Sequence, residues 1–440
     1  MGLAMRIQFH THIEGDVGRC IPNTKHRKFP SHLIKPAGDL VLETMTYPMN
    51  CWLNTKVSPN NVYWWCDAQF LPNDDNTLFL TGGAYDPRTM HAWNSVKHVR
   101  PGRVMKLDLM KASAVVFPES SMPNFPNIQM HLSGEYVGYI GPEAVKIQTT
   151  NHEDVFIKHK DIRNCNYKFC AFSPNGKYLA ILLSVSKSFE IIISRVDKGL
   201  TFHDIDLPLS RHIQGFKGHS FNEHVECKWS PDSEYITVCS NIEYVFVLSK
   251  NLEIVVDIAA DILPANAYPS WSGTFDYDPR SCHDILAVGC KDRKVYFLNV
   301  SSKETFLQSE VLGKDDIDSL AFHPQGTSIA VGTRDFNIYL LSTNDAQMVF
   351  QIDMNFHVPD LTVKNSSFPS IMRLSFSSTG EQLATASSDG KARIWQLPVD
   401  ISLFRLCKWI IMSHVPGTKL QQLPLPKQIV SKLLEMPRHP

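Results

Sequence analysis

The amino-acid sequence predicts an all-β fold, in which a repeated β-sheet unit closes into a ring, followed by a small helical module at the C-terminus. Two observations predict it. A pattern of apolar alternation, tight turns and small-residue strands recurs along residues 61–397. After Pro398 the apolar residues change from a period of two to the spacing of an amphipathic helix.

The clearest copy of the repeated unit lies at residues 371–398 and predicts three strands. In the first strand, apolar residues such as Phe376 alternate with polar neighbours. The second strand ends at Asp389-Gly390, a dipeptide typical of tight turns between strands. The third strand carries Trp395, which we expect to be buried.

The same pattern recurs upstream and predicts seven units in all. They lie at residues 68–83 with 104–109, 128–148, 170–194, 227–249, 275–300, 320–342 and 371–398. Five of them carry an aromatic residue at an equivalent position, namely Phe172, Trp229, Tyr277, Phe322 and Phe376, at spacings of 57, 48, 45 and 54 residues. Each unit shows three strands, so we expect a fourth strand in the connecting segments.

Residues 1–60 form an N-terminal extension of less certain role. Residues 39–44 could supply a strand that closes the ring by pairing with the last unit. Closure matters because a single sheet cannot bury both of its faces, whereas sheets stacked in a ring bury one another and protect their edges.

Composition excludes several classes of partner. Lys and Arg number 43 against 44 Asp and Glu, so the net charge of −1 provides no general attraction for nucleic acid or for an anionic membrane. No apolar run approaches the ~18 residues of a membrane span. Ten cysteines without a Cys-x-x-Cys pair fit a reducing compartment. We therefore expect a cytoplasmic protein, with the nucleus as the alternative.

The sequence contains none of the common catalytic or nucleotide-binding motifs. His10 and His12 lack a third ligand at a recognisable spacing, so we expect no metal site and no cofactor. We expect a non-catalytic protein. Because a fold alone does not exclude an enzyme, acidic or His residues converging at the centre of the ring would favour a catalytic alternative.

The C-terminal segment predicts two short helices separated by a proline-containing strip. The first helix places its apolar residues at i, i+3, i+4, i+7 and i+8 on one face: these are Leu403, Leu406, Cys407, Ile410 and Ile411. The strip is Leu423-Pro424-Leu425-Pro426, whose prolines exclude a regular helix. About forty residues cannot sustain a core alone, so this surface must pack on the ring or on another protein.

The repeated unit resembles the WD40 family, over about residues 61–397. Trp395 occupies the family's Trp-Asp position, although Gln396 replaces the Asp. Gly218-His219 looks like the family's Gly-His dipeptide, which the other units lack. The resemblance implies a seven-bladed WD40-type β-propeller over residues 61–397.

The C-terminal segment, residues 398–440, resembles a SOCS box, and the whole layout resembles the WD-repeat and SOCS-box protein family. Ser402-Leu403-x-x-x-Cys407-x-x-x-Ile411 matches the BC box (402–411), and Leu423-Pro424-Leu425-Pro426 matches the cullin box (423–426). The resemblance implies that the helix binds Elongin C (with Elongin B). It further implies that the strip binds cullin 5 while the propeller binds a protein substrate, still unidentified, for ubiquitination.

Two other interpretations remain open. The C-terminal helices could brace the propeller of a WD-repeat scaffold that has no ligase function, in which case Leu403 would be buried against the blades. The more distant alternative is a propeller enzyme. The sequence does not distinguish which face of the propeller binds a substrate.

Overall fold

A computed structural model of the 440-residue chain describes the ring and its nearest connections. The described residues are 44–48, 62–85, 98–109, 113–116, 128–140, 145–150, 154–155, 165–185, 188–195, 209–213, 225–240, 244–270, 274–280, 284–354, 370–387 and 391–397. The Asp389-Gly390 dipeptide, residues 39–43 and the C-terminal segment after residue 397 lie outside these ranges.

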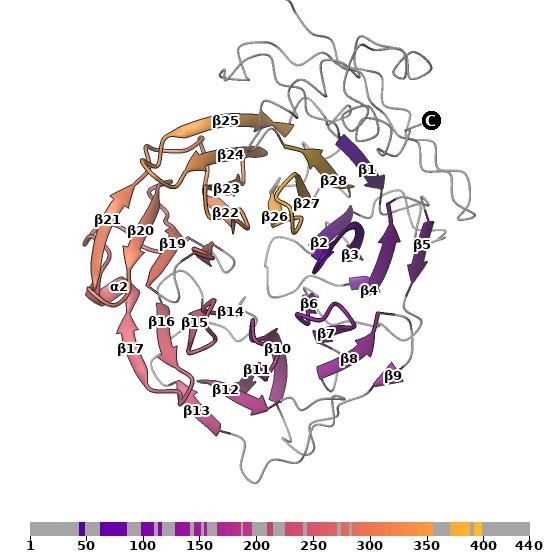
Figure 1. The fold of residues 1–440 in the computed structure, drawn as a ribbon, viewed down its shortest axis with the longest axis horizontal. Coiled ribbons are helices and arrows are strands. Elements are labelled where there is room, and N and C mark those ends of the chain that lie inside the picture. Colours follow the sequence, from indigo (N-terminus) through magenta and orange to yellow (C-terminus); the bar gives the residue numbers. More distant parts are fainter. Residues whose placement is uncertain are drawn as a thin grey trace, which may run out of the picture.

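The described residues form seven four-stranded antiparallel sheets arranged around a ring (Figure 1). Sheet 1 contains β2 (Val62–Leu71), β3 (Asp74–Tyr85), β4 (His98–Asp108) and β5 (Ser113–Val116); sheet 2 contains β6 (Ile128–Met130), β7 (Tyr136–Ile140), β8 (Val145–Thr149) and β9 (Asp154–Val155). Sheet 3 contains β10 (Cys165–Phe172), β11 (Tyr178–Val185), β12 (Ser188–Arg195) and β13 (Leu209–Ile213); sheet 4 contains β14 (Val225–Trp229), β15 (Tyr235–Ser240), β16 (Tyr244–Ser249) and β17 (Ile254–Asp257). Sheet 5 contains β18 (Phe275–Tyr277), β19 (Ile285–Gly289), β20 (Val295–Asn299) and β21 (Glu304–Gln308); sheet 6 contains β22 (Ile317–Phe322), β23 (Ser328–Thr333), β24 (Asn337–Ser342) and β25 (Met348–Asp353).

Sheet 7 is built from both ends of the ring. It contains β26 (Ile371–Phe376), β27 (Gln382–Ser387), β28 (Lys391–Gln396) and, at its outer edge, β1 (Thr44–Pro48). The β1 and β28 strands are antiparallel, with Thr44 opposite Trp395. The closing strand therefore begins at the last residue of the 39–44 segment suggested by the sequence and extends beyond it.

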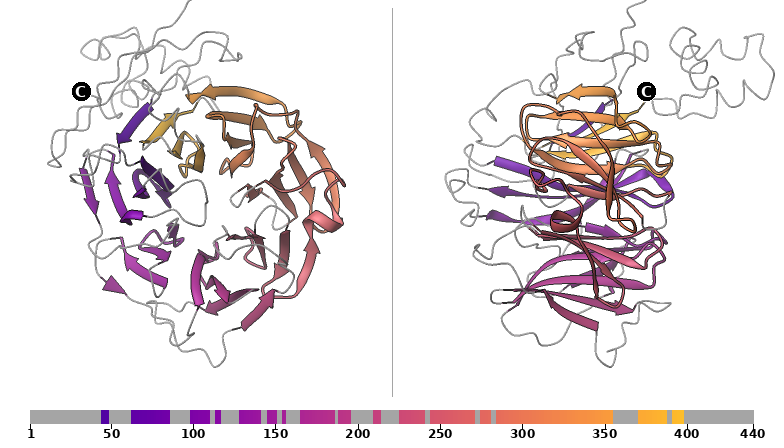
Figure 2. Two further views of the ribbon diagram at one scale, coloured as in Figure 1. Left: turned by 180° about the vertical axis from the view of Figure 1, so that it is seen from behind. Right: turned by 90° about the vertical axis from the view of Figure 1, so that its left-hand side faces the viewer.

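The all-β arrangement and the fourth strand of each sheet are as the sequence predicts. The fourth strands β5, β9, β13, β17, β21 and β25 all lie in the segments that connect one repeated unit to the next. The innermost strands of neighbouring sheets contact one another around the ring. Figure 2 shows the ring from behind and from the side.

The aromatic residues used to align the repeats share one structural position. Phe172, Trp229, Tyr277, Phe322 and Phe376 are each the last residue of the innermost strand of their sheet. A turn follows. In the four turns that the structure describes at this point, after Phe172, Trp229, Phe322 and Phe376, the fourth residue after the aromatic has a positive φ. That residue is Gly in three of these turns, as in Gly176 (φ 69°), which fits because Gly adopts this conformation without steric cost.

Sheet 4 departs from this rule with Ser233 (φ 64°), a non-glycine residue in the left-handed region. The Ser233 hydroxyl accepts a hydrogen bond from the backbone N–H of Asn175 in sheet 3, at 3.1 Å. The serine therefore offsets part of its conformational cost by linking two neighbouring sheets.

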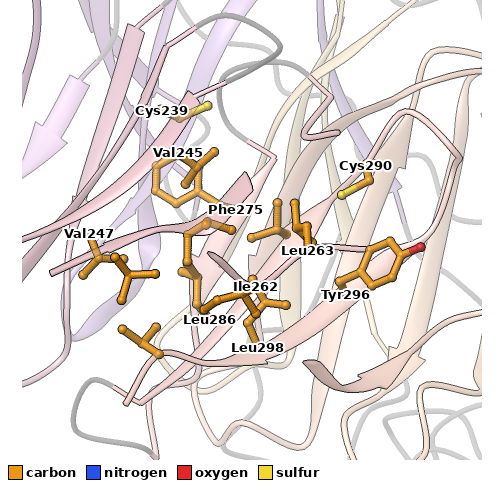
Figure 3. Packing of buried hydrophobic residues seen from close by; sticks show 14 of the residues in the cluster. Cys239, Val245, Val247, Ile262, Leu263, Phe275, Leu286, Cys290, Tyr296 and Leu298 are labelled. Carbon is orange, nitrogen blue, oxygen red and sulfur yellow. The ribbon is translucent and has the colours of Figure 1, made fainter. Parts of the chain in front are cut away.

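Apolar clusters between neighbouring sheets form the core, because each sheet presents one face to the sheet before it and one to the sheet after it. Sheets 4 and 5 show an additional device: the short helix α2 (Ile258–Asp261) and the loop after it join the cluster between them. Ile262 and Leu263 from this connection pack with residues such as Val245 and Leu286 (Figure 3). The connection fills the space between two sheets that diverge toward the circumference.

Trp395 is fully buried between sheets 6 and 7, as predicted, and its indole Nε1 donates a hydrogen bond to Thr385 Oγ1 at 3.2 Å. We expect Trp395→Ala to lower the free energy of unfolding by ~3–5 kcal/mol, because it leaves a large cavity. Chemical denaturation of the full chain measures this loss. The matched control is Gln396→Ala at the half-buried neighbouring position, which should change stability by less than about 1 kcal/mol. An unchanged unfolding midpoint for Trp395→Ala would contradict the packing described.

Candidate functional site

The residues predicted to bind ligase components lie outside the described part of the chain. They are Leu403, Leu406, Cys407, Ile410 and Ile411 for Elongin C, and Leu423, Pro424, Leu425 and Pro426 for the cullin. The structure therefore leaves their grouping as a prediction. His10 and His12 also lie outside it.

At the centre of the ring, a charged cluster joins sheets 1, 4 and 7. Sheets 7 and 1 are neighbours in the closed ring, whereas sheet 4 is a neighbour of neither. Arg373 of β26 places its Nη1 atom 2.6 Å from Glu226 Oε1 of β14, which belongs to sheet 4. Its Nε atom lies 3.4 Å from Asp67 Oδ1 of β2, in sheet 1. The side chains of Arg373, Asp67 and Glu226 are only 12%, 1% and 4% exposed. One guanidinium thus holds two buried carboxylates from sheets 1 and 4.

The three members of this central cluster occupy the same position in their strands. Each stands three residues before the aromatic residue near the strand's end, which is Phe70 for Asp67 and Phe376 for Arg373. A β-bulge directly precedes both Asp67 and Arg373, where the pairing skips one residue. Bulges change the direction of the strand locally, which helps the neighbouring strands β2 and β26 to direct Asp67 and Arg373 toward each other. The pairing of β14, which carries Glu226, has no bulge.

Backbone groups further fix Asp67. Its carboxylate accepts hydrogen bonds from the backbone N–H of Ala68, at 2.8 Å, and of Ile128 in sheet 2, at 3.1 Å. Gln69 supports the same junction by donating to the carbonyl of Ile128 at 2.6 Å. Asp67 therefore links sheet 1 to sheet 2 as well as to Arg373.

At this cluster, burial and ion pairing shift the pKa of a side chain in opposite directions. Burial raises the pKa of Asp67, and Arg373 opposes that rise without cancelling it. For Arg373, burial lowers the pKa, but the attraction of Glu226 and then Asp67 outweighs it and raises the pKa above its ordinary value. The guanidinium is therefore charged at every physiological pH, and its charge opposes the effect of burial on Asp67.

A second charged contact links sheets 4, 5 and 6. Lys228 of β14 lies 3.3 Å from Asp276 Oδ1 of β18, and its Nζ donates to the carbonyl of Phe275 at 2.9 Å. Asp276 Oδ2 in turn accepts a hydrogen bond from the backbone N–H of Phe322 in β22, at 2.8 Å. Side chains of one inner strand thus reach the backbone of the next around this half of the ring.

Asp318 forms a third junction, between sheets 6 and 7. It is the extra residue of a bulge in β22, and it lies 3.0 Å from Arg334 Nη2. Its other oxygen accepts a hydrogen bond from the hydroxyl of Ser370, just before β26, at 2.5 Å. Burial raises the pKa of Asp318 to about 6, although Arg334 opposes the rise.

Acidic side chains thus converge at the centre of the ring, as the propeller-enzyme alternative requires. The described carboxylates, however, already contact a guanidinium or backbone N–H groups. Asp67 and Glu226 contact the same guanidinium, and Asp67 also accepts two backbone N–H groups. Such an arrangement can fix strands relative to one another, since paired and hydrogen-bonded charges tolerate burial. What the described geometry builds is a brace between sheets.

Four cysteine side chains are described at other points of the ring. The thiols of Cys170, Cys227, Cys239 and Cys290 are free and buried, and burial raises the pKa of each. Within the described ranges, no group of three or more His, Cys, Asp or Glu side chains is placed to hold a metal ion. No helix in this part of the chain is long and apolar enough to cross a membrane.

Asp67, Glu226 and Arg373 were not among the residues predicted from the sequence to form a site. A signal was present: in the aligned repeats these charges fall where sheets 3, 5 and 6 carry Phe169, Thr274 and Ser319. A charge at a position that other repeats fill with apolar or small residues indicates a specific partner. The partner itself could not be identified, because Glu226 and Arg373 are 147 residues apart.

We expect Arg373→Met to lower the free energy of unfolding by ~3–5 kcal/mol, because it leaves two buried carboxylates without their counter-ion. Chemical denaturation measures the loss, and a cycle with Glu226→Gln should give a coupling of about 1 kcal/mol or more. Lys250→Met is the control, because the paired side chains of Lys250 and Glu234 are 41% and 49% exposed, so that solvent screens the pair and its loss should change stability far less. Equal losses for the two variants would contradict a central brace.

A pH dependence follows from Asp318. Its folded pKa of about 6 exceeds the ordinary value of 3.8, so the folded state retains a proton that the unfolded state releases between those values. The stability contributed by this proton is complete below pH 4 and is lost as the pH rises through 6. Compared with Asp318→Asn, the natural chain should therefore lose on the order of 2–3 kcal/mol between pH 4 and pH 7. Urea unfolding of both proteins across this range measures the difference, and a difference that is constant or grows with pH would contradict the assignment.

Two protein-family models match consecutive parts of the chain. Residues 277–365 match the model described as the anaphase-promoting complex subunit 4 WD40 domain, and residues 361–396 match the WD domain, G-beta repeat. No curated protein matches the chain. The matched residues run from the last residue of β18 to the end of β28. The chain therefore contains WD40 repeats, which indicate a role in protein interaction or as a scaffold, and neither match extends into residues 398–440.

Proposed function

We propose that this chain is a non-catalytic substrate-recognition adaptor of a ubiquitin ligase that contains Elongin B, Elongin C and cullin 5. In this proposal the seven sheets are the complete set of blades of a WD40 propeller, which binds the protein to be ubiquitinated. Residues 398–440 are a SOCS box that binds the ligase. The adaptor needs no catalytic group, cofactor or metal of its own, and it acts in the cytoplasm or the nucleus.

One observation carries the proposal: two short motifs stand in a fixed order directly after the WD40 repeats. Ser402-Leu403-x-x-x-Cys407-x-x-x-Ile411 begins six residues after the end of β28, and Leu423-Pro424-Leu425-Pro426 follows it. Each motif is short, but both together, in this order and this place, resemble the BC box and cullin box of SOCS-box proteins. This resemblance rests on the sequence alone.

The motifs suit two different modes of recognition. A helix that presents Leu403, Cys407 and Ile411 on one face can lie in a groove, with Leu403 as the main anchor and the small Cys407 allowing close approach. The Leu-Pro-Leu-Pro strip is stiff and extended, because proline fixes its backbone. The first mode suits Elongin C and the second suits the cullin.

The alternative is a WD40 scaffold whose C-terminal helices pack against the propeller. It is favoured by the end of the family matches at residue 396, which leaves residues 398–440 without a matched family. The two functions differ in one respect that can be measured: Leu403 contacts a partner in the adaptor and contacts the chain's own sheets in the scaffold.

We expect Leu403→Ala combined with Cys407→Phe to abolish capture of Elongin C by the immobilised full chain. Loss of a buried anchor of ≥ 2 kcal/mol weakens binding by roughly thirtyfold, and a bulky ring at position 407 obstructs the approach of the helix. The melting temperature of the propeller should not change. Arg405→Ala, predicted to lie on the opposite side of the same helix, is the control and should retain Elongin C.

The outcomes separate the two functions. If Elongin C still binds the double variant, the BC-box assignment is wrong. If binding is lost and the propeller also melts at a much lower temperature, the helix braces the sheets and the scaffold is favoured. Replacement of Leu423, Pro424, Leu425 and Pro426 by Ala should weaken cullin 5 recruitment while Elongin C is retained. Loss of both partners together would point instead to a collapsed module.

A further inference from the structure

The outer strands of sheets 4, 5 and 6 share a feature that follows neither from the closure of the ring nor from the proposed SOCS box. In each of them one residue is skipped in the pairing with the neighbouring strand. The skipped residues are Val255 in β17, Phe306 in β21 and Val349 in β25. In the described pairings of the other four outer strands no residue is skipped.

The three bulges occupy equivalent positions. The register shift falls between Val247 and Leu248 in sheet 4, and between Phe297 and Leu298 in sheet 5. In sheet 6 the shift falls between Leu340 and Leu341. Aligned by their partner strands, the bulged residues therefore stand at one level on three consecutive sheets, whose outer strands follow one another along the circumference (Figure 1).

All three bulged residues are apolar and exposed. Val255 is 37% exposed, Phe306 52% and Val349 40%. Ile254, beside Val255, is also exposed. A bulge alone is sufficient to protect an edge strand from pairing with another chain, and a charged or polar residue would serve that purpose better than Phe. The repeated choice of an apolar residue at this position needs another explanation.

The segments that carry these apolar residues are rich in acidic side chains. The three outer-edge segments, residues 250–261, 300–311 and 343–354, contain seven carboxylates but only two basic residues. The carboxylates belong to Glu253, Asp257, Asp261, Glu304, Glu310, Asp345 and Asp353. Both basic residues are already paired, Lys250 with Glu234 at 2.6 Å and Lys303 with Asp261 at 3.4 Å. The whole chain has a net charge of only −1, so this negative charge is local.

We call the three outer-edge segments, with their bulged apolar residues, the acidic belt. Its charge determines which kind of partner fits it. A second copy of the belt would be repelled by like charge, as would nucleic acid or an anionic membrane. A segment that combines Lys or Arg with apolar side chains is complementary in both respects. We infer that the acidic belt is a docking surface for a basic, apolar segment of a partner protein.

The inference does not depend on the ligase function, because the belt lies on the WD40 sheets and not in residues 398–440. In an adaptor the partner would be the substrate, and in a scaffold it would be a bound component. Failure of Elongin C capture would therefore not contradict docking at the acidic belt. Failure of a peptide to bind the belt would not contradict the SOCS-box assignment.

The test uses the full-length protein and two fluorescent synthetic peptides of equal length, one alternating Lys with Leu and the other alternating Lys with Ser. The Lys/Leu peptide should bind, and more tightly than the Lys/Ser peptide, because only it offers apolar contacts. The combined variant Val255→Ser, Phe306→Ser and Val349→Ser should weaken its binding by about tenfold or more. High salt should weaken binding as well, since the belt is exposed to solvent.

The matched control is Leu132→Ser, which removes an equally exposed apolar residue, 52%, from the turn between β6 and β7 in sheet 2. It should leave the affinity unchanged, and all variants should melt as the natural chain does. No binding of the Lys/Leu peptide, equal binding by the triple variant, or the same loss in Leu132→Ser would overturn the inference.

A photo-crosslinking residue at position 306 identifies the occupant directly. A crosslink from position 306 to the Lys/Leu peptide supports docking of a partner segment. Residues 401–440 contain six Lys or Arg against one acidic residue, Glu435. A crosslink to this basic segment of the same chain, or to a second copy, would overturn the assignment to a separate partner.

Discussion

The antiparallel pairing of β1 with β28 is the contact on which the ring depends. Every sheet has two apolar faces, and only a closed ring gives each face a neighbour. Sheets 1 to 6 each take their four strands from one continuous stretch of chain, whereas sheet 7 takes three strands from residues 371–396 and one from residues 44–48. Without β1, the edge of β28 would be open, and the last sheet would be incomplete next to sheet 1.

The fold could be predicted from the sequence because its determinants are local and repeated. The aromatic residue that ends five of the seven innermost strands, exemplified by Phe322 and Phe376, and the turn that follows it indicate both the register and the spacing of the units. The sequence predicts that each unit has a fourth strand but does not show which residues form it. These strands are too short to give a clear pattern, since β9 has two residues and β17 four. The closing strand was suggested at residues 39–44 but runs over residues 44–48, since its composition is weakly patterned and its position is decided by a partner 351 residues away, Trp395.

The central cluster could not be predicted, for a physical reason of a different kind. The aligned repeats mark Asp67, Glu226 and Arg373 as unusual charges, but they do not show which residues pair, because their proximity results from the closure of the whole ring. In a repeat architecture most contacts join nearest neighbours, so stability is nearly a sum of units and interfaces. The Arg373–Glu226 pair joins sheets 7 and 4, which are not neighbours. It therefore couples opposite parts of the ring and favours unfolding as one unit, whereas Asp67 adds the usual neighbour contact.

The composition of sheet 7 also has a consequence for synthesis on the ribosome. The closing strand at residues 44–48 is made early, but its partner β28 is completed only at residue 396. Closing so long a loop costs about 2 kcal/mol more conformational entropy than closing one of about thirty residues, and such non-local pairing is intrinsically slow. Sheets 1 to 6 can form one after another during translation, while the faces and edges at the two ends of the array stay open, and this is when the chain is most exposed to aggregation and to chaperones.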